Sequence, residues 1–314
     1  MDMKRIISCS RRTDIPAFYS RWLVNRLRAG YCHTFNPFGG QIYRVSLEPE
    51  DCIALVFWTR NPRPLLPYLD ELDQRGYVYY FNFTILGYPK AIDSHNPSLE
   101  ACLWTFRKLA ERLESWRMQW RYDPIVFSTA TPVEYHLDRF ERIARALEGH
   151  TQHCTFSFVD FYGKTRRNLK HISRESGIYI YQPSLEEQLE LVRRLADIAA
   201  AHGISFNSCC DDALLAAGTQ KNHCIDPSLI RRLAPSLKAY PDFKPTRQDC
   251  GCVASFDIGV YDTCLFGCSY CYATNHRQAA LRRHAQHNPT DSLLWRPEHL
   301  LHQDIDALAV PLKS

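Results

Sequence analysis

Short apolar runs rich in β-branched and aromatic residues alternate along the chain with longer stretches in which apolar residues recur every three or four positions. The first pattern is typical of buried strands, and the second of helices that cover a sheet. In residues 185–201, for example, the apolar side chains follow the helical spacing, while Glu186, Glu190 and Arg193 fall on the opposite face. We predict strands at residues 5–10, 53–58, 77–85, 119–122, 155–159, 204–208 and 253–258.

The stretches with helical spacing lie between these strands. We predict helices at about 16–29, 64–75, 97–115, 132–148, 184–201, 227–237 and 273–285. A regular alternation of strands and helices indicates an α/β fold with a parallel sheet. The predicted strands, spread over roughly 260 residues, suit a single (βα) barrel, complete or partial, better than two independent domains. We expect the barrel to span residues 1–288, and a C-terminal tail, 289–314, to pack on it.

One basic segment, residues 163–182, interrupts this alternation. Its basic side chains are Lys164, Arg166, Arg167, Lys170, His171 and Arg174. We predict a surface loop here. It is either a solvated run of charge or a lid that contacts an anion, and both interpretations stay open.

The composition is that of an ordinary globular protein, with 45% hydrophobic and 23% charged residues in 314. The net charge of +4 permits an anionic ligand but falls short of a nucleic-acid-binding composition. The longest apolar run, residues 52–58, is far shorter than the roughly 20 residues of a membrane helix. The apolar stretch between Lys4 and Arg11 is too short for a secretory signal. We therefore expect a cytoplasmic protein without a membrane partner.

Cysteine is unusually frequent, with 13 residues. In a chain without an export signal, such cysteines are more often metal ligands or catalytic groups than disulfide partners. They are unevenly distributed, because most of them fall between positions 209 and 271. The cysteines of that region are Cys209, Cys210, Cys224, Cys250, Cys252, Cys264, Cys268 and Cys271.

The strongest motif is the C-x3-C-x2-C spacing of Cys264, Cys268 and Cys271, on an expected loop at 259–273 after the last predicted strand. Thiolates are the usual ligands of iron–sulfur clusters, and three of them leave one iron of a [4Fe-4S] cluster open. The motif resembles the signature of the radical S-adenosylmethionine (radical SAM) superfamily. The resemblance implies that the open iron chelates the amino and carboxylate groups of SAM. It also implies that Tyr270 contacts the adenine.

Two other interpretations of this motif stay open. The first is a structural zinc site completed by Cys252 or His276, although zinc sites are usually built from two C-x2-C-like pairs. The second is a nucleophilic cysteine, which calls for one activated thiol beside a base rather than for three thiols together.

A second cysteine group lies in the segment 205–252. Of its five members, we select Cys210, Cys224, Cys250 and Cys252 as ligands of a possible second [4Fe-4S] cluster. A structural zinc ion and buried free cysteines are the alternatives.

Polar side chains follow several predicted strands at the point where each strand ends. A parallel barrel assembles its active site at that edge. Each such residue alone is more commonly a cap or a turn residue, but their recurrence predicts one shared cavity. As catalytic candidates we name Arg11, Asp14, Arg60, Asp123 and Asp160. As cofactor-binding candidates we name Ser10, Asn82, Arg121 and Tyr270. Arginine's planar fork suits a carboxylate or phosphate, and the aspartates are acceptors for ribose hydroxyls or a substrate amine.

Four motifs together resemble one bacterial family of unassigned role, the domain-of-unknown-function 1848 family. They are SRRTDIP at 10–16, VFWTRNP at 56–62, WRYDP at 120–124 and DIGVYDTC at 257–264. The resemblance spans about residues 5–275, and the family is noted for a radical-SAM-like cysteine cluster near its carboxyl end. The usual radical SAM barrel has its cluster loop after the first strand, whereas here the loop follows the last one. A circular permutation reconciles the two orders and predicts that strand 253–258 pairs beside strand 5–10.

We therefore expect a cytoplasmic radical SAM enzyme that uses a [4Fe-4S] cluster to cleave SAM reductively and abstracts hydrogen from an unknown substrate. Its expected partners are a small-molecule or peptide substrate and a flavodoxin- or ferredoxin-type electron donor. A nucleic-acid partner stays open but is not indicated. The alternative is a zinc-stabilised module that binds nucleic acid or protein without catalysis, through residues 164–174 and the arginines that follow the first strand.

Overall fold

A curved parallel sheet forms the centre of the computed structural model, which describes residues 4–245 and 247–312. The strand order is β10-β1-β4-β5-β6-β7-β8-β9, and every neighbouring pair is parallel. The strands are β1 (Arg5–Cys9), β4 (Cys52–Thr59), β5 (Tyr79–Thr84), β6 (Met118–Ile125), β7 (His153–Phe158), β8 (Ser205–Ser208), β9 (Gln220–Lys221) and β10 (Phe256–Asp257). The predicted α/β fold with a parallel sheet is confirmed.

The first and the last strand of this sheet in sequence order, β1 and β10, are neighbours in space. β10 lies beside β1, with Ile7 opposite Phe256 and Ser8 opposite Asp257. The pairing predicted between these two segments is therefore confirmed. β10 and β9 stand at the two ends of the order, so the hydrogen-bonded ladder is open in the part of the chain that the structure describes.

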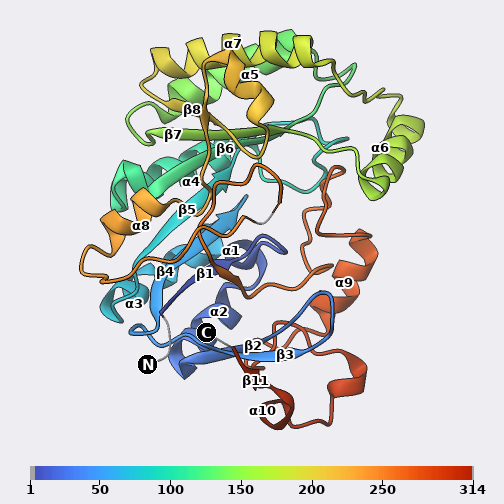
Figure 1. Cartoon of the computed structure of the whole chain (residues 1–314). Coiled ribbons are helices and arrows are strands. Elements are labelled where there is room, and N and C mark those ends of the chain that lie inside the picture. Colours follow the sequence, from blue (N-terminus) through green and yellow to red (C-terminus); the bar gives the residue numbers. More distant parts are fainter. Residues whose placement is uncertain (1–3, 246, 313–314) are drawn as a thin grey trace.

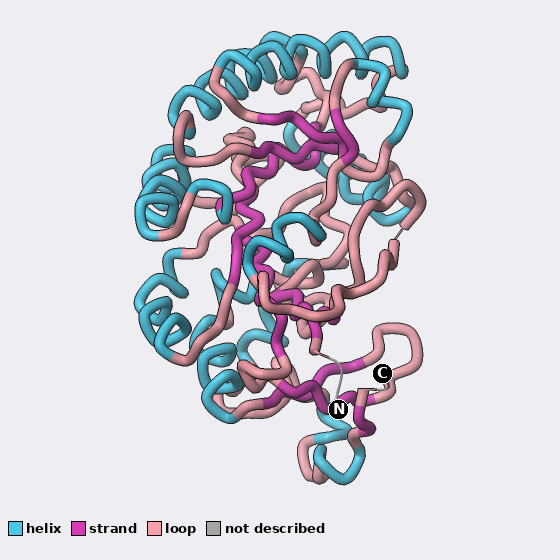
Figure 2. Tube along the Cα trace, turned by 60° about the vertical axis from the view of Figure 1, so that its left-hand side comes forward, coloured by secondary structure: helices cyan, strands magenta, loops and turns pink. Residues whose placement is uncertain are grey.

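Helices cover the outer side of the sheet, on the left in Figure 2. The α-helices of the described residues are α1 (Ile15–Phe18), α2 (Ser20–Ala29), α3 (Leu69–Gln74), α4 (Leu99–Arg112), α5 (Val133–Leu147), α6 (Gly163–Ser176), α7 (Leu185–Ala201), α8 (Pro227–Leu233), α9 (Arg277–Ala285) and α10 (Ile305–Leu308). Of these, α2, α3, α4, α5 and α7 contribute buried side chains to the large core on the outer side of the sheet. Short 3-10 helices are η1 (Arg63–Tyr68), η2 (Ser115–Arg117), η3 (Asp212–Ala217) and η4 (Glu298–Leu300). α7 shows why such a helix forms: Ser184 and Glu187 make a capping box, and Leu191, Val192 and Leu195 are buried.

The prediction of a basic surface loop at 163–182 is wrong, because residues 163–176 form α6. Its apolar residues are few, but Leu169 is buried and Ile172 packs against the core at helical spacing. The helix ends at Gly177, whose φ of +71° gives the left-handed conformation common after a helix.

A small second sheet, not predicted from the sequence, combines β2 (Tyr31–Phe35), β3 (Ile42–Ser46) and β11 (Val310–Pro311). The tail reaches it across α2. The indole Nε1 of Trp22 donates to the carbonyl of Asp291 at 3.0 Å, and the Asn25 amide donates to that of Pro289 at 2.9 Å. Leu293 of the tail is fully buried.

Successive residues of each strand point to opposite faces of the sheet. On β4, Leu55 and Phe57 belong to the large core under the outer helices, whereas Val56 belongs to a smaller core on the inner face. That inner core contains Cys209, Cys224, Cys250 and Cys252. The cysteine-rich segment therefore covers the inner face of the sheet. Within the described ranges, no helix combines the length and hydropathy needed to cross a bilayer.

Candidate functional site

One buried carboxylate fastens the end of β10 to the end of β1. Asp257 accepts hydrogen bonds from the hydroxyl groups of Ser8 (2.8 Å) and Ser10 (2.5 Å) and from the backbone N–H of Arg11 (2.7 Å). Next to it, Gly259 approaches Ser10 so closely that a Cβ atom would lie 2.0 Å from the serine Oγ. A Cβ atom would displace Ser10, so glycine at position 259 lets the chain after β10 pass close to the end of β1.

The loop after β10 carries the three cysteines of that motif. Gly267, with a φ of +67°, turns the chain between Cys264 and Cys268. The Sγ atom of Cys271 accepts hydrogen bonds from the backbone N–H groups of residues 273 and 274, each at 3.3 Å. Hydrogen bonds to sulfur tune a thiolate that ligates an iron–sulfur cluster.

The three thiols influence one another electrostatically. The pKa of Cys264 is raised to about 12, mainly by burial and to a smaller extent by the neighbouring Cys271 and Asp14. Burial also raises the pKa of Cys268 well above its usual value, with further contributions from both other thiols. The three thiols therefore lie within electrostatic range of one another. Without a metal, Cys264 and Cys268 are neutral at pH 7, and binding of a metal would displace their protons.

A buried polar network stands beside this loop. Arg60 donates to Asp93 at 3.0 Å and to the Tyr270 hydroxyl at 2.6 Å, and that hydroxyl donates to Asp93 at 2.7 Å. An isolated bridge pairs Asp93 with Cys268, which holds the network against the cysteine loop. The Tyr270 ring packs edge-on against Tyr88. Asp93 has no sequence signal, because it follows no predicted strand directly.

Asp14 connects three parts of the site. Its carboxylate accepts the backbone N–H of Ala17, which caps α1, and the backbone N–H of Arg60 at the end of β4. Burial raises its pKa to about 7, against the lowering effect of these hydrogen bonds. Cys264 lies close enough for its pKa to respond to Asp14. Asp14 is therefore a buried carboxyl group adjoining the first thiol of the motif.

The second cysteine group is a closed ring of five thiols. The Sγ atom of Cys209 lies 3.7 Å from that of Cys210 and 3.6 Å from that of Cys224. Hydrogen bonds continue from Cys224 to Cys252, from Cys252 to Cys250 and from Cys250 to Cys210. Cys209, which the sequence-based selection left out, is thus a full member of the group.

Two arginines face this ring from different sides. Arg121 on β6 donates to the Cys224 sulfur at 2.8 Å and forms an ion pair with Asp123. Arg247 donates to the Cys209 sulfur at 3.7 Å and pairs with Asp160 at 3.0 Å. Asn82, on β5, donates to the carbonyl oxygen of residue 224 at 3.3 Å.

The strand-end residues fall into two sets by the contacts that they make. Those from β1 and β4 lie beside β10 and the loop at 259–273, and they are Ser10, Arg11, Asp14 and Arg60, together with Tyr270 of the loop itself. Those from β5, β6 and β7 meet the five-thiol ring: Asn82, Arg121, Asp123 and Asp160. Position along the sheet explains the division, because β1 and β7 are separated by three intervening strands.

Trp58, at the end of β4, lies between the two groups. The guanidinium of Arg11 is 5.7 Å from its ring centroid, and that of Arg121 is 5.1 Å from it. Arg11 also accepts, at its carbonyl, a hydrogen bond from Tyr272, the residue after Cys271. A continuous path of contacts thus leads from the cysteine loop through Trp58 to Cys224.

A family model described as a domain of unknown function (DUF1848) matches residues 6–273. The chain belongs to the DUF1848 family. The resemblance found in the sequence motifs is confirmed, and both cysteine groups lie inside the DUF1848 region. No curated protein matches the chain significantly.

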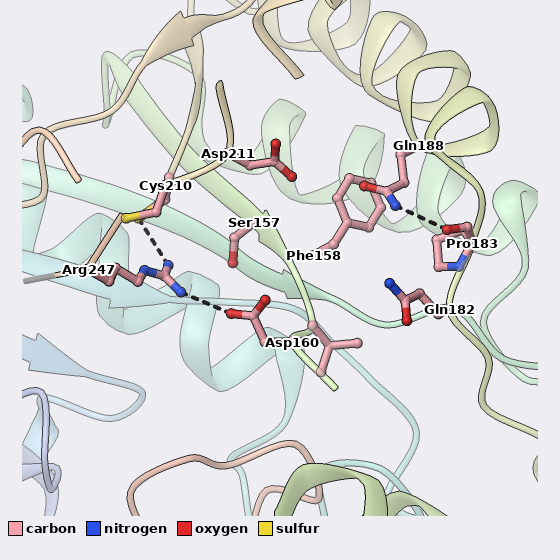
Figure 3. Close-up of a pocket in the computed structure, with 11 residues that line it drawn as sticks. Ser157, Phe158, Asp160, Gln182, Pro183, Gln188, Cys210, Asp211 and Arg247 are labelled. Atoms are coloured by element: carbon pink, nitrogen blue, oxygen red, sulfur yellow. Dashed lines mark hydrogen bonds and ion pairs between the residues drawn. The ribbon is translucent and has the colours of Figure 1, made fainter. Parts of the chain in front are cut away.

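This DUF1848 fold has one small cavity beside the second cysteine group and another beside the Arg60–Asp93 pair. The first, of about 110 Å³, is bordered by Cys209 and Cys210 and by the charged side chains of Asp160, Asp211 and Arg247. Figure 3 shows the Arg247 guanidinium between the Cys210 sulfur and the Asp160 carboxylate. The second, of about 100 Å³, is bordered by Arg60 and Asp93 and by residues of the loop before α4.

All cysteines of the DUF1848 chain lie in the described ranges, and each is free of a disulfide. In residues 4–245 and 247–312, no three His, Cys, Asp or Glu side chains are grouped so as to hold a single metal ion. A cuboidal iron–sulfur cluster requires ligand sulfurs that are farther apart than those of a single metal ion, because they surround a body of several atoms. His276, the alternative fourth ligand, is exposed at the start of α9.

Proposed function

We propose that this DUF1848 protein is a radical SAM enzyme whose [4Fe-4S] cluster is held by Cys264, Cys268 and Cys271. The observation that carries the proposal is the place of these thiols. They lie on one loop, within electrostatic reach of one another, at the carboxyl edge of a parallel sheet. That edge is where parallel α/β folds bind their cofactors.

The residues of the loop fit a cluster with one open iron. The C-x3-C-x2-C motif supplies three thiols, and backbone N–H groups already point at the Cys271 sulfur. When bound, the cluster and SAM together supply one-electron reductive cleavage of a sulfonium. Burial raises the pKa of Cys268, and the positive charge of the nearby Arg60 opposes that rise. Arg60 would therefore offset part of the negative charge that the thiolates gather there.

The neighbouring polar groups would orient the bound cofactor. Arg60 is held rigidly by Asp93 and Tyr270, so its guanidinium keeps one position. Asp14 is fixed by two backbone N–H groups, and with a pKa of about 7 it can hold or release a proton near neutral pH. The buried surroundings would keep water away from reactive species.

The order of the strands supports the same proposal. The loop follows β10, and β10 takes the place beside β1 that a first strand would occupy if the chain were rearranged. We include in the proposal that this fold is a permuted form of the radical SAM barrel. The proposal also includes a cytoplasmic location and a flavodoxin- or ferredoxin-type electron donor.

The test is reductive cleavage of SAM. The full chain is reconstituted anaerobically with iron and sulfide, reduced with dithionite and mixed with SAM, and 5′-deoxyadenosine is measured by chromatography with mass detection. We expect the product from the natural sequence and from Cys52→Ala, a cysteine outside both groups, and none from Cys268→Ala. A brown chain loaded with iron at the loop that never yields the product would refute the proposal. Zinc in a colourless chain would favour the zinc-stabilised binding module instead.

A further inference from the structure

We propose that the second cysteine group is a separate metal–sulfur centre, held by Cys209, Cys224, Cys250 and Cys252, with Cys210 left at the wall of the adjoining cavity. The ligand chemistry is four thiolates around an iron–sulfur cluster, because the described side chains are not grouped so as to hold a single metal ion. The proposal does not depend on the function proposed for the loop at 264–271.

The first support is convergence. The five thiols come from three separate segments: the end of β8, the turn after β9 and the stretch before β10. They nevertheless form a closed ring in which each sulfur contacts two others. Free cysteines that serve only as small apolar side chains have no reason to gather in this way.

The second support is the set of N–H groups aimed at the sulfurs. Cys224 accepts from Arg121 at 2.8 Å and from the Asn222 amide at 2.9 Å, and Cys252 accepts from the backbone N–H of Ile225 at 3.3 Å. A neutral thiol sulfur is only a weak acceptor. Arg121 is buried, with 7% of its surface exposed, so directing its N–H at a sulfur is favourable mainly when that sulfur is anionic.

Four of the five thiols are buried, and the fifth, Cys210, is partly exposed. Cys209, Cys224, Cys250 and Cys252 are each at most 7% exposed. Cys210 is only half-buried, and it borders the cavity beside Arg247. Its φ of +59° is in the left-handed region, which is uncommon for a residue with a Cβ atom. Four thiolates complete a four-iron cluster, so Cys210 is not needed as a ligand.

This ligand set differs from the sequence-based selection by exchanging Cys210 for Cys209. It also places the centre at one side of the cavity of about 110 Å³, because Cys209 and Cys210 both border that cavity. A small ligand in the cavity would meet Cys210 and the Arg247–Asp160 pair beside the metal centre.

The test measures iron, acid-labile sulfide and zinc per chain in the full-length protein purified without oxygen. The variant Cys264→Ala/Cys268→Ala/Cys271→Ala removes every thiol of the first group, so any metal it retains belongs to the second. We expect it to keep a stoichiometric thiol-bound metal. Adding Cys224→Ala and Cys252→Ala to it should remove that metal, whereas adding Cys52→Ala should not. Iron with acid-labile sulfide would support the cluster, whereas one zinc ion per chain without sulfide would overturn it.

Ligand identity is tested with single changes in the same background. Cys210→Ala should leave the metal content unchanged, and Cys209→Ala should lower it. The reverse result would overturn the ligand set. Absence of metal from the background variant, or retention of metal after loss of Cys224 and Cys252, would overturn the centre itself.

A second measurement leaves all five cysteines of the ring unchanged. Native alkylation of the background variant should leave four thiols of the ring unmodified until a chelator is added, as read by peptide mass spectrometry. Equal modification of all five thiols before and after the chelator would likewise refute the centre. Both measurements use a variant that lacks Cys264, Cys268 and Cys271. Their results therefore do not depend on whether the loop at 264–271 supports SAM cleavage.

Discussion

At the scale of single residues, the Tyr270 hydroxyl is hydrogen-bonded to two charged side chains. Its hydroxyl accepts from Arg60 and donates to Asp93, and both partners are part of a buried ion pair. Removing one member of such a network leaves the other groups with unmet hydrogen-bonding capacity.

Tyr270→Phe should therefore lower the free energy of unfolding by about 1–3 kcal/mol. Urea denaturation measures it, with Tyr179→Phe as the control, because Tyr179 is 63% exposed. Equal stabilities of the two variants would show that the hydroxyl is not held as the structure describes.

Gly259 offers a second test at this scale. A Cβ atom there would lie 2.0 Å from the Oγ and 2.6 Å from the Cβ of Ser10. Because Ser10 is itself bonded to Asp257, it cannot move without disturbing the junction of β1 and β10.

Gly259→Ala should cost about 1–3 kcal/mol of stability through overpacking. Gly163→Ala is the matched control, since nothing lies within 4 Å of the added atom there. Thermal melting of both variants gives the comparison, and an unchanged melting temperature for Gly259→Ala would contradict the close approach.

Arg121 acts on the sulfur ring through one hydrogen bond to Cys224. If the ring binds metal as proposed, Arg121→Gln should weaken metal affinity by roughly 10–100-fold, the usual effect of losing a group that supports a metal ligand. Competition with a chromogenic chelator measures the affinity. The exposed Arg145, paired on the surface with Glu141, provides a control substitution to glutamine. An affinity equal to that of the control would exclude a role for Arg121 at the metal.

Among whole elements, α5 carries a buried titratable group. His136 is fully buried, bonded to the Tyr122 hydroxyl and the Val126 carbonyl. Burial lowers its pKa to about 4, whereas histidine in an unfolded chain titrates near 6.5. Between these values the unfolded chain takes up a proton that the folded chain does not. Stability from this group is thus complete above about pH 6.5 and is lost as the pH falls toward 4.

The shift corresponds to about 3 kcal/mol at its full extent. His136→Gln should flatten this part of the pH dependence, measured by urea unfolding at about pH 7 and about pH 4.5. The exposed His171 of α6, changed in the same way, should leave the pH dependence as in the natural sequence. A steep fall that persists in His136→Gln would assign the effect to other groups.

Strands that are buried on both faces could be predicted from the sequence. The long strands β1, β4, β5 and β6 lie near their predicted positions, because parallel strands covered on both faces appear as continuous apolar runs. β2 was missed because its buried positions include His33 and Thr34, which give no apolar pattern. α6 was missed because basic side chains outnumber its apolar ones.

The candidate site was predictable in its cysteines but not in its partners. Spacing alone identified Cys264, Cys268 and Cys271, whereas Asp93 and Cys209 depend on contacts between distant segments. Asp257 appeared only inside a motif, without a role. Such partners are fixed by strand order, and a sequence without related sequences carries no signal of which loops meet.

For the whole molecule, the tail binds distant parts of the fold together. Leu293 is fully buried and pairs through a bridge with His33 of β2, while residues 289–291 accept hydrogen bonds from α2. The tail therefore connects the small sheet to α2, which covers the main sheet.

Leu293→Ala should lower the free energy of unfolding by about 2–5 kcal/mol through a cavity in this shared region. Leu308→Ala, at a position 43% exposed, should cost much less. Denaturation followed by circular dichroism compares them, and similar costs for both would show that the tail adds little to the fold.

The pairing of β10 with β1 has a consequence for biosynthesis. One edge of β1 stays without its neighbour until residues 256–257 leave the ribosome, on the order of ten seconds or more after β1 itself at ordinary translation rates. During that interval a nascent apolar strand is exposed to other chains. Growth conditions that slow synthesis should therefore favour aggregation of this protein, and insertion of any inorganic cofactor at Cys264 must come after the rest of the large sheet has been made.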